Sequence, residues 1–257
     1  MTAMRWILLG ALTAMLLLIG CRSTMNTTTK NSNNMVTIKH IISADHQLLV
    51  MEAGKQAQVR FVSHKQQGFD AAPSINDESI ALNVAAAFTL DTETMDVCGD
   101  HVVAGELIKG YSDITATGHA LIVDNKVKIL HNSHLEKSIQ EAIKNKGYLF
   151  QQCLIIEDGK GIVEHIPKAI RDRKAHIIFR AACLTAEGRF AIVQGGEEMY
   201  CNEFIDALVA MGIQQALYLD MGTWAWGWVR DGEDIKELAT RFGNTQYQSN
   251  WLQLTTR

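Results

Sequence analysis

Two charged residues, Arg180 and Asp220, are the strongest candidates for chemistry in this sequence of 257 residues. Asp220 follows an apolar stretch over residues 215–219, which predicts a buried strand with the carboxylate projecting from its end. That carboxylate could act as a nucleophile, a base or an electrostatic partner of developing positive charge. Arg180 carries a planar guanidinium that matches phosphate oxygens and stays charged at ordinary pH. Two structural roles remain open, since Asp220 could cap its loop and Arg180 could belong to a buried ion pair.

The loop that follows Asp220 contains residues suited to binding. Thr223 and the backbone amides around Gly222 could hold a phosphate or sugar oxygen, and a turn role is the alternative for Thr223. Three tryptophans come next at alternate positions, so on an extended strand their indoles would share one face. Such a row suits stacking on sugar rings, although filling the core is an equal alternative. The three indoles belong to Trp224, Trp226 and Trp228.

Short apolar stretches separated by turn residues predict a sheet built mostly of hairpins. Single strands are expected over residues 35–40, 46–53 and 57–64. Three later segments place an Asp, Asn or Gly turn between two apolar stretches, as hairpins require. Their turns lie at Asp124-Asn125, Asp158-Gly159 and Gly188.

Helices are expected over residues 133–147, 203–211 and 233–240. The first begins with the capping-box pattern of Ser133 and Glu136, and Asn202 is the expected cap of the second. Because strands outnumber helices and few β-α-β alternations occur, we predict the α+β class, with a mixed, mostly antiparallel, hairpin-rich sheet and two or three packed helices. Glycines expected to end the first two helices are Gly147 and Gly212.

Four segments, in the same order along the chain, resemble the phosphodiester glycosidase family, the relatives of N-acetylglucosamine-1-phosphodiester alpha-N-acetylglucosaminidase. Residues 211–223 (MGIQQALYLDMGT) resemble the family stretch "lG...AlyLDGGGS". Arg180 to Cys183 with residues 186–191 (AEGRFA) are similar to "RxaiG...dGk..f". Residues 152–160 (QCLIIEDGK) resemble "sgPmLvidGk", and residues 84–88 (VAAAF) lie where relatives have "NaGfF".

The resemblance implies a hydrolase of glycosyl phosphodiesters or related extracellular glycans, with Arg180 and Asp220 at its centre. We predict no cofactor and name no metal ligand, and the sequence leaves metal dependence open. The resemblance also places Asp91 near the substrate, where a surface loop acid is the alternative.

The chain departs from the family at Ala86 and Met221, which replace two glycines, and at Thr223, which replaces a serine. The family asparagine is either replaced by Val84 or shifted to Asn83. These side chains narrow a pocket that elsewhere needs glycine, which would alter or remove catalysis.

Two other functions fit the same residues. A non-catalytic glycan-binding lipoprotein would keep the scaffold and use the tryptophan row to hold a carbohydrate. A purely structural envelope protein would use neither the row nor the charged pair.

The N-terminus predicts a lipid-anchored protein of the bacterial cell envelope. Arg5 precedes an apolar run over residues 7–19, which is too short to span a bilayer of about 30 Å. The run ends at Cys21 in a sequence that resembles the lipobox of bacterial lipoproteins. We therefore expect a signal peptide over residues 1–20, a lipid on Cys21, a polar tether over residues 21–34 and a phosphodiester glycosidase-like domain over residues 35–257.

Composition narrows the range of partners. Removing the signal takes away only Arg5 and changes the formal net charge from -4 to -5, which excludes an electrostatic case for nucleic acid. The expected partners are a carbohydrate or sugar phosphate and, through Cys21, the membrane. His131 and His134 lack a third metal ligand and are interpreted as a solvated pair. The remaining cysteines could pair or remain buried thiols, and they are Cys98, Cys153, Cys183 and Cys201.

Overall fold

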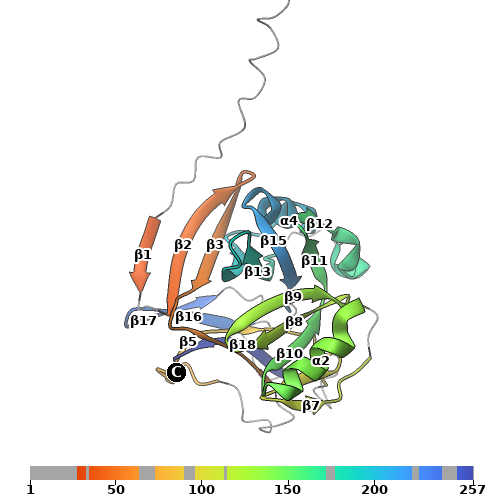
Figure 1. Cartoon of the computed structure of the whole chain (residues 1–257). Helices are drawn as coiled ribbons and strands as arrows, with labels where there is room; N and C mark the ends of the chain where they lie inside the picture. Colours follow the sequence, from red (N-terminus) through yellow and green to blue (C-terminus); the bar gives the residue numbers. More distant parts are fainter. Residues whose placement is uncertain are drawn as a thin grey trace, which may run out of the picture.

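The computed structural model describes residues 28–32, 35–63, 73–89, 96–112, 115–171, 177–221, 226–238 and 248–256. Three sheets surround a common apolar core, and short helices cover two of their outer faces (Figure 1). Neighbouring strands run antiparallel in each sheet, as in the pairings β2–β3, β10–β8 and β18–β5. The predicted α+β class with antiparallel, hairpin-rich sheets is confirmed.

The large sheet has eight strands in the order β1-β2-β3-β14-β13-β15-β11-β12. Helix α4 (Cys201–Ala210) packs on its outer face through Phe204, Ile205 and Leu208. The strands are β1 (Thr28–Ser32), β2 (Val36–Ser43), β3 (His46–Ala53), β11 (Leu154–Glu157), β12 (Lys160–Gly161), β13 (Arg180–Thr185), β14 (Phe190–Gly195) and β15 (Ile213–Tyr218).

The β10 sheet has five strands in the order β7-β6-β10-β8-β9. Helix α2 (Leu135–Lys144) packs on it through a small cluster that includes Ala142, Leu121 and Leu149. The strands are β6 (His101–Val103), β7 (Glu106–Ile108), β8 (Gly118–Val123), β9 (Lys126–His131) and β10 (Tyr148–Gln152). The short helices are η1 (Asn132–His134), η2 (Val163–His165) and α3 (Lys168–Arg171).

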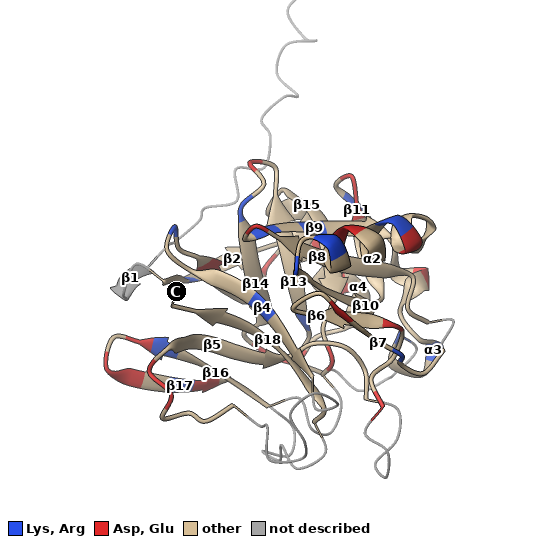
Figure 2. Cartoon of the chain, turned by 60° about the horizontal axis from the view of Figure 1, so that its bottom comes forward, with Lys and Arg blue, Asp and Glu red and all other residues tan. Residues whose placement is uncertain are grey.

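The β5 sheet also has five strands, in the order β17-β16-β5-β18-β4. Charged residues gather on α2 and on the β16–β17 hairpin of this sheet, whereas β5 and β18 carry none (Figure 2). The strands are β4 (Gln58–Ser63), β5 (Ile80–Ala85), β16 (Gly227–Asp231), β17 (Asp234–Leu238) and β18 (Asn250–Thr255).

The common core receives side chains from every sheet. Phe61 on β4 stacks on Phe150 on β10, with ring centroids 5.0 Å apart, and both rings are fully buried. Leu217 on β15 and Leu82 on β5 belong to the same cluster. Each such side chain contributes about 1.5–3 kcal/mol on burial, so the core fixes the three sheets relative to one another.

The three hairpins expected from turn residues are confirmed. Asp124 and Asn125 connect β8 to β9 with φ of 50° and 60°, and Asp158 and Gly159 connect β11 to β12 with φ of 49° and 74°. Gly188, with φ of 72°, lies in the turn between β13 and β14. Positive φ is the conformation that favours Asp, Asn and Gly in these turns.

Two of the predicted helices form, but their ends differ from prediction. The expected capping box at Ser133 is wrong, because η1 occupies these residues and His131 accepts a hydrogen bond from the Ser133 amide. Gly147 does not take the left-handed conformation; Lys146 does. Gly147 is needed instead for close approach, since a Cβ there would lie 2.4 Å from the carbonyl oxygen of Ile122.

Helix α4 begins two residues earlier than predicted, so the expected cap at Asn202 is wrong. Tyr200 is its N-cap, and the Tyr200 amide donates to the Glu203 carboxylate over 2.8 Å. Gly212 follows the helix with φ of 82°, as expected for a terminating glycine.

The predicted helix over residues 233–240 is wrong. Residues Asp234 to Leu238 form strand β17, which pairs with β16 across a tight turn in which Gly232 has φ of 69°. A short polar stretch gains little as an isolated helix, whereas β16 offers it a complete ladder of backbone hydrogen bonds.

The N-terminal part begins, within the described residues, with strand β1. Thr28 to Ser32 lie inside the segment expected to be a polar tether, and they pair with β2 in the register Thr28↔His40 to Ser32↔Val36. None of the helices among the described residues has the length and apolar character needed to cross a bilayer.

The four cysteines of the described residues are buried thiols and form no disulfide; they are Cys98, Cys153, Cys183 and Cys201. Burial raises the pKa of the Cys201 thiol to about 12.

Candidate functional site

The three sheets meet at the carbonyl oxygen of Ala86, directly after β5. It accepts a hydrogen bond from the Asp220 amide over 2.9 Å, at the end of the large sheet. It also accepts one from Nε2 of Gln152, the last residue of β10, over 3.3 Å. The segment over residues 84–88 and Asp220, which sequence analysis placed in one site, therefore lie in contact.

Asn250 binds both backbone polar groups of Ala87, the next residue of the same segment. Its Oδ1 accepts from the Ala87 amide over 2.7 Å, and its Nδ2 donates to the Ala87 carbonyl oxygen over 3.0 Å. Asn250 opens β18, and it is fully buried like Gln152. Because these buried side chains satisfy backbone groups, they fix the conformation of the segment beside Asp220.

Arg180 is fully buried at the start of β13. Its Nε and Nη2 donate to Oε1 of Gln194 over 2.8 and 2.7 Å, and its carbonyl oxygen accepts from the Leu219 amide over 2.9 Å. Burial lowers the pKa of the guanidinium to about 9, against the opposing effects of Tyr218 and Asp220. Arg180 therefore stays cationic at neutral pH.

Asp220 and Arg180 share one electrostatic environment. The negative charge of Asp220 raises the pKa of Arg180, and it adds to burial in raising the pKa of the Tyr218 phenol well above its ordinary value. Unlike Arg180, Asp220 is partly exposed at the end of β15. The field of Asp220 therefore reaches Arg180, and of the two predicted catalytic residues Asp220 is partly exposed whereas Arg180 is fully buried.

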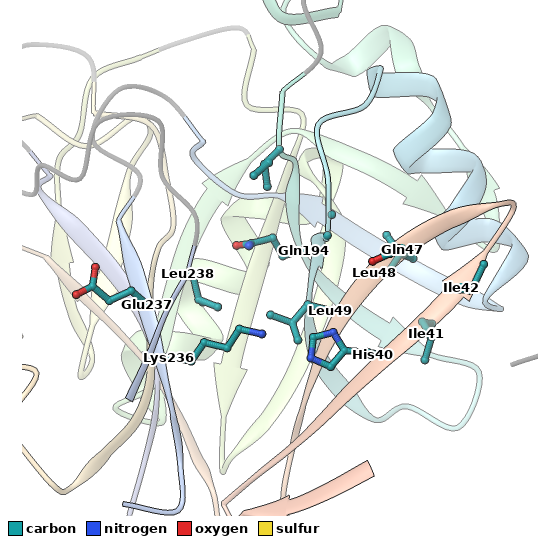
Figure 3. Close-up of a pocket in the computed structure, with 13 residues that line it drawn as sticks. His40, Ile41, Ile42, Gln47, Leu48, Leu49, Gln194, Lys236, Glu237 and Leu238 are labelled. Carbon is teal, nitrogen blue, oxygen red and sulfur yellow. The ribbon is translucent and has the colours of Figure 1, made fainter. Parts of the chain in front are cut away.

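A cleft of about 400 Å³ lies on the other side of Arg180, between the large sheet and β17 (Figure 3). Strand pairing places Arg180, Gln194, Leu49 and His40 in one row across β13, β14, β3 and β2. Gln194 and His40 line the cleft, and Lys236 extends into it from β17. Gln194 therefore separates the buried guanidinium from the open space.

Two of the predicted tryptophans fall within the described residues, Trp226 and Trp228. Trp228 is fully buried with the Arg230 guanidinium 5.6 Å from its ring centroid, so it offers no free face to a sugar. Trp226 is partly exposed, and its Nε1 donates to Oε2 of Glu237 over 3.4 Å. The core alternative therefore holds for Trp228, and stacking remains a prediction for Trp226.

Several predicted residues lie outside the described residues, namely Cys21, Asp91, Gly222, Thr223 and Trp224. Conversely, Gln152, Gln194 and Asn250 were missed. Gln194 could have been found, because it lies opposite Arg180 across the predicted hairpin at Gly188. Gln152 lay inside a segment of family resemblance, but its contact with Ala86 spans 66 residues and leaves no local signal.

No family model and no curated protein matches the sequence. The structure is similar to the zebrafish N-acetylglucosamine-1-phosphodiester alpha-N-acetylglucosaminidase catalytic domain auto-inhibited by its pro-peptide, with a TM-score of 0.60 and 12% identity, over 90% of this chain and 85% of that one. It is also similar to a hypothetical protein from Synechocystis, with a TM-score of 0.57 and 12% identity, over 90% of this chain and 64% of that one. At this identity the likeness shows the fold alone: the chain has the scaffold of that glycosidase domain.

Proposed function

We propose that this chain is an envelope lipoprotein that hydrolyses a glycosyl phosphodiester, with Asp220 and Arg180 at the centre of the site. The observation that carries the proposal is the junction of three sheets at Ala86, where the backbone of residues 219 and 220 hydrogen-bonds to Arg180 and Ala86 and the charge of Asp220 acts on the buried guanidinium. The scaffold shared with a domain named for cleaving a sugar phosphodiester supports the same reaction. Lipid on Cys21 is the expected anchor.

The reaction uses the two charges at opposite ends of the bond that breaks. Water adds to the anomeric carbon as the bond to the bridging phosphate oxygen breaks, and the electron pair leaves with a phosphomonoester. Asp220 stabilises the positive charge that develops at the anomeric carbon and accepts the proton of the water. Since Gln194 occupies Nε and Nη2, Arg180 acts on the leaving phosphate through its field and by holding the Gln194 amide.

The proposal is tested by release of sugar from a panel of sugar-1-phosphodiesters. Asp220→Asn should lower kcat/KM by at least about a hundredfold, the usual contribution of a positioned acid or base. Arg180→Lys keeps the charge but loses the fork, and should lower it by a smaller factor.

Asp206→Asn is the matched control, because Asp206 is an exposed carboxylate on α4 away from the junction. Equal loss in the Asp206 and Asp220 variants, or turnover unchanged by both site variants, would remove the site from the reaction. Thermal unfolding of each variant separates loss of chemistry from loss of fold.

A non-catalytic glycan-binding function is the second candidate. The full burial of Arg180 and the partial exposure of Trp226 favour it, because a binding protein needs an aromatic platform but no accessible guanidinium. Absence of turnover across the panel, combined with glycan affinity that Trp226→Ala removes, would decide for this reading.

A further inference from the structure

The side-chain amide of Gln194 is held in one orientation by Arg180. Its Oε1 accepts from Nε and Nη2 of the guanidinium, over 2.8 and 2.7 Å. The reversed amide would place its amino group against these two donors, so the hydrogen bonds fix which end of the amide is the oxygen. Nε2 of Gln194 is therefore directed away from the donors of Arg180.

This amino group is a donor without an acceptor. Gln194 is only 4% exposed, and it lines the cleft between the large sheet and β17. Within the described part of the chain, no group accepts a hydrogen bond from its Nε2. The guanidinium polarises the amide from the oxygen side, which strengthens Nε2 as a donor. Because a buried donor without an acceptor destabilises a fold, a bound molecule with an acceptor oxygen would complete this site.

The charged side chain that enters the cleft is cationic. Lys236 extends into it from β17, and His40 lines it from β2 (Figure 3). Lys236 is exposed and forms no ion pair with any of the described residues. Glu237 follows Lys236 on the strand, so its carboxylate points to the opposite face, where it accepts from Nε1 of Trp226. The cleft is thus suited to an anion.

Much of the remaining wall is apolar. Leu48 and Leu49 on β3 and Leu238 on β17 are buried side chains that line it, together with Ile41 and Ile178. Its volume of about 400 Å³ is in the range of small-molecule sites, which combine apolar walls with a few polar groups. A ligand that fills the cleft therefore needs an apolar part beside its anionic end.

The donors around the cleft favour a carboxylate over a phosphate. A phosphate monoester presents three acceptor oxygens and carries up to two negative charges, whereas a carboxylate presents two oxygens and carries one. The backbone amides of the wall do not add donors for a phosphate. Those of Gly195 and Gly196 donate to the carbonyl oxygens of Phe179 and Gln47.

We infer that this cleft is a binding site for a small amphiphilic carboxylate, in which the carboxylate is joined to an apolar chain or ring. One carboxylate oxygen accepts from Nε2 of Gln194 and the other from Nζ of Lys236. The apolar part lies against Leu49 and Leu238. The site does not include Asp220, so the inference goes beyond the proposed hydrolysis and does not depend on it.

Titration of the purified full-length chain with hexanoate tests the site. The NMR signal of the Gln194 side-chain amino group should shift with one saturable binding curve. Hexanoate should bind at least about tenfold more tightly than acetate, because its additional methylenes become buried. Hexanol should bind at least about tenfold more weakly than hexanoate, because hydrogen bonds to a charged group are stronger. Hexyl phosphate should also bind more weakly than hexanoate.

Lys236→Gln removes the cation, with Lys126→Gln as its matched control. Lys126 is likewise an exposed strand residue, on β9 in another sheet, and it forms no ion pair with the described residues. The Lys236 variant should bind hexanoate at least about threefold more weakly, the usual scale of an exposed ion pair. The control variant should bind it as the native chain does.

Gln194→Glu removes the donor and keeps an oxygen for Arg180. The second carboxylate oxygen takes the place of Nε2 and repels an anion, so hexanoate affinity should fall at least about tenfold. The variant also identifies the Gln194 amino signal, which disappears from its spectrum. Thermal unfolding of the variant shows whether the fold is kept.

Three results would overturn the inference: no saturable binding of hexanoate, equal binding of hexanoate and hexanol, or hexanoate affinity that both cleft variants leave unchanged. Tighter binding of hexyl phosphate than of hexanoate would overturn the carboxylate class. Because binding is measured without turnover, absence of hydrolysis would remove the proposed function and leave this inference standing.

Discussion

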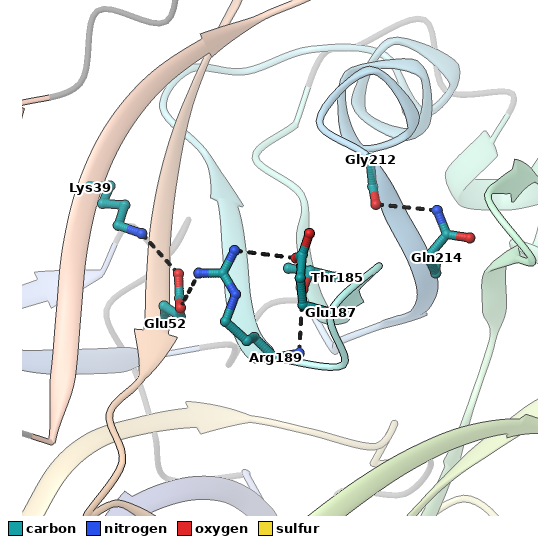
Figure 4. Close-up of polar contacts among 7 residues, drawn as sticks. All are labelled: Lys39, Glu52, Thr185, Glu187, Arg189, Gly212 and Gln214. Carbon is teal, nitrogen blue, oxygen red and sulfur yellow. Dashed lines mark hydrogen bonds and ion pairs between the residues drawn. The ribbon is translucent and has the colours of Figure 1, made fainter.

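Two arginines on the same hairpin differ in burial and in the charge of their partners. Arg180 opens β13, is fully buried and donates to the neutral Gln194. Arg189, just before β14, has a side chain 52% exposed and donates to the carboxylates of Glu52 and Glu187 (Figure 4). Burial lowers the pKa of Arg180, whereas the hydrogen bond to Glu52 raises the pKa of Arg189.

The difference indicates that Arg180 is a candidate for function, whereas Arg189 has a structural role. On the surface, two cations and two anions balance one another across β2, β3 and the β13–β14 turn, namely Lys39, Arg189, Glu52 and Glu187. In the interior, the Arg180 guanidinium donates to the Gln194 amide within the field of Asp220, and burial lowers its pKa, as is common at functional sites.

The largest effect should come from removing the interior charge. Arg180→Gln should destabilise the fold by about 2–4 kcal/mol, because it leaves the buried Oε1 of Gln194 without its donors and removes buried volume. Arg189→Gln should cost only about 0.2–1 kcal/mol, as exposed ion pairs do. Urea unfolding of both variants measures the contrast, and similar losses would show that the two environments are energetically alike.

A buried histidine provides the next test. Burial lowers the pKa of His119 to about 4, although its Nδ1 hydrogen bond with Oδ1 of Asn132 opposes the shift. The unfolded chain, with a histidine pKa of about 6.5, binds more protons between these values, so this group destabilises the fold increasingly as the pH falls from about 6.5 to 4, by about 3 kcal/mol at most.

His119→Gln should remove that dependence. The stability advantage of the native protein over the variant should shrink over this pH range, as measured by urea midpoints at successive pH values. Parallel stability curves would contradict the assigned environment of His119.

The smallest effect belongs to the surface network. Burial would raise the pKa of Glu52, but hydrogen bonds from Lys39 and Arg189 outweigh it and the pKa lies below 4.5. The associated stability is present above pH 4.5 and is lost as the pH falls through the folded pKa. Glu52→Gln should therefore cost at most about 1 kcal/mol at pH 7 and nothing at low pH, by the same urea measurement.

The sequence was most informative where structure is local. Turns at Asp124-Asn125, Asp158-Gly159 and Gly188 predicted hairpins because positive φ favours these residue types. Strand β17 was mistaken for a helix because it is stabilised by hydrogen bonds to β16, which its own sequence does not predict. Strand β1 was missed because its polar sequence shows no alternation of apolar and polar residues, and its pairing with β2 is not visible in it.

The candidate site divides in the same way. Arg180 starts β13 and Asp220 follows β15, so local patterns could place both candidates at strand ends. Their role in a site stays a prediction. Asn250 reaches Ala87 over 163 residues of chain, and no local property of Asn250 foretells that contact. Residues that position the site, such as Asn250, are therefore harder to predict from the sequence than the candidates for its chemistry, Arg180 and Asp220.

The carbonyl of Ala86 also has a dynamic consequence. Since it joins the ends of the large sheet and the β10 sheet to β5, the amide of Asp220 cannot be released without separating layers that share one core. Hydrogen exchange at that amide should follow cooperative unfolding of the whole domain rather than local opening. A variant that lowers the free energy of unfolding of the domain should then speed exchange at the Asp220 amide to the same extent.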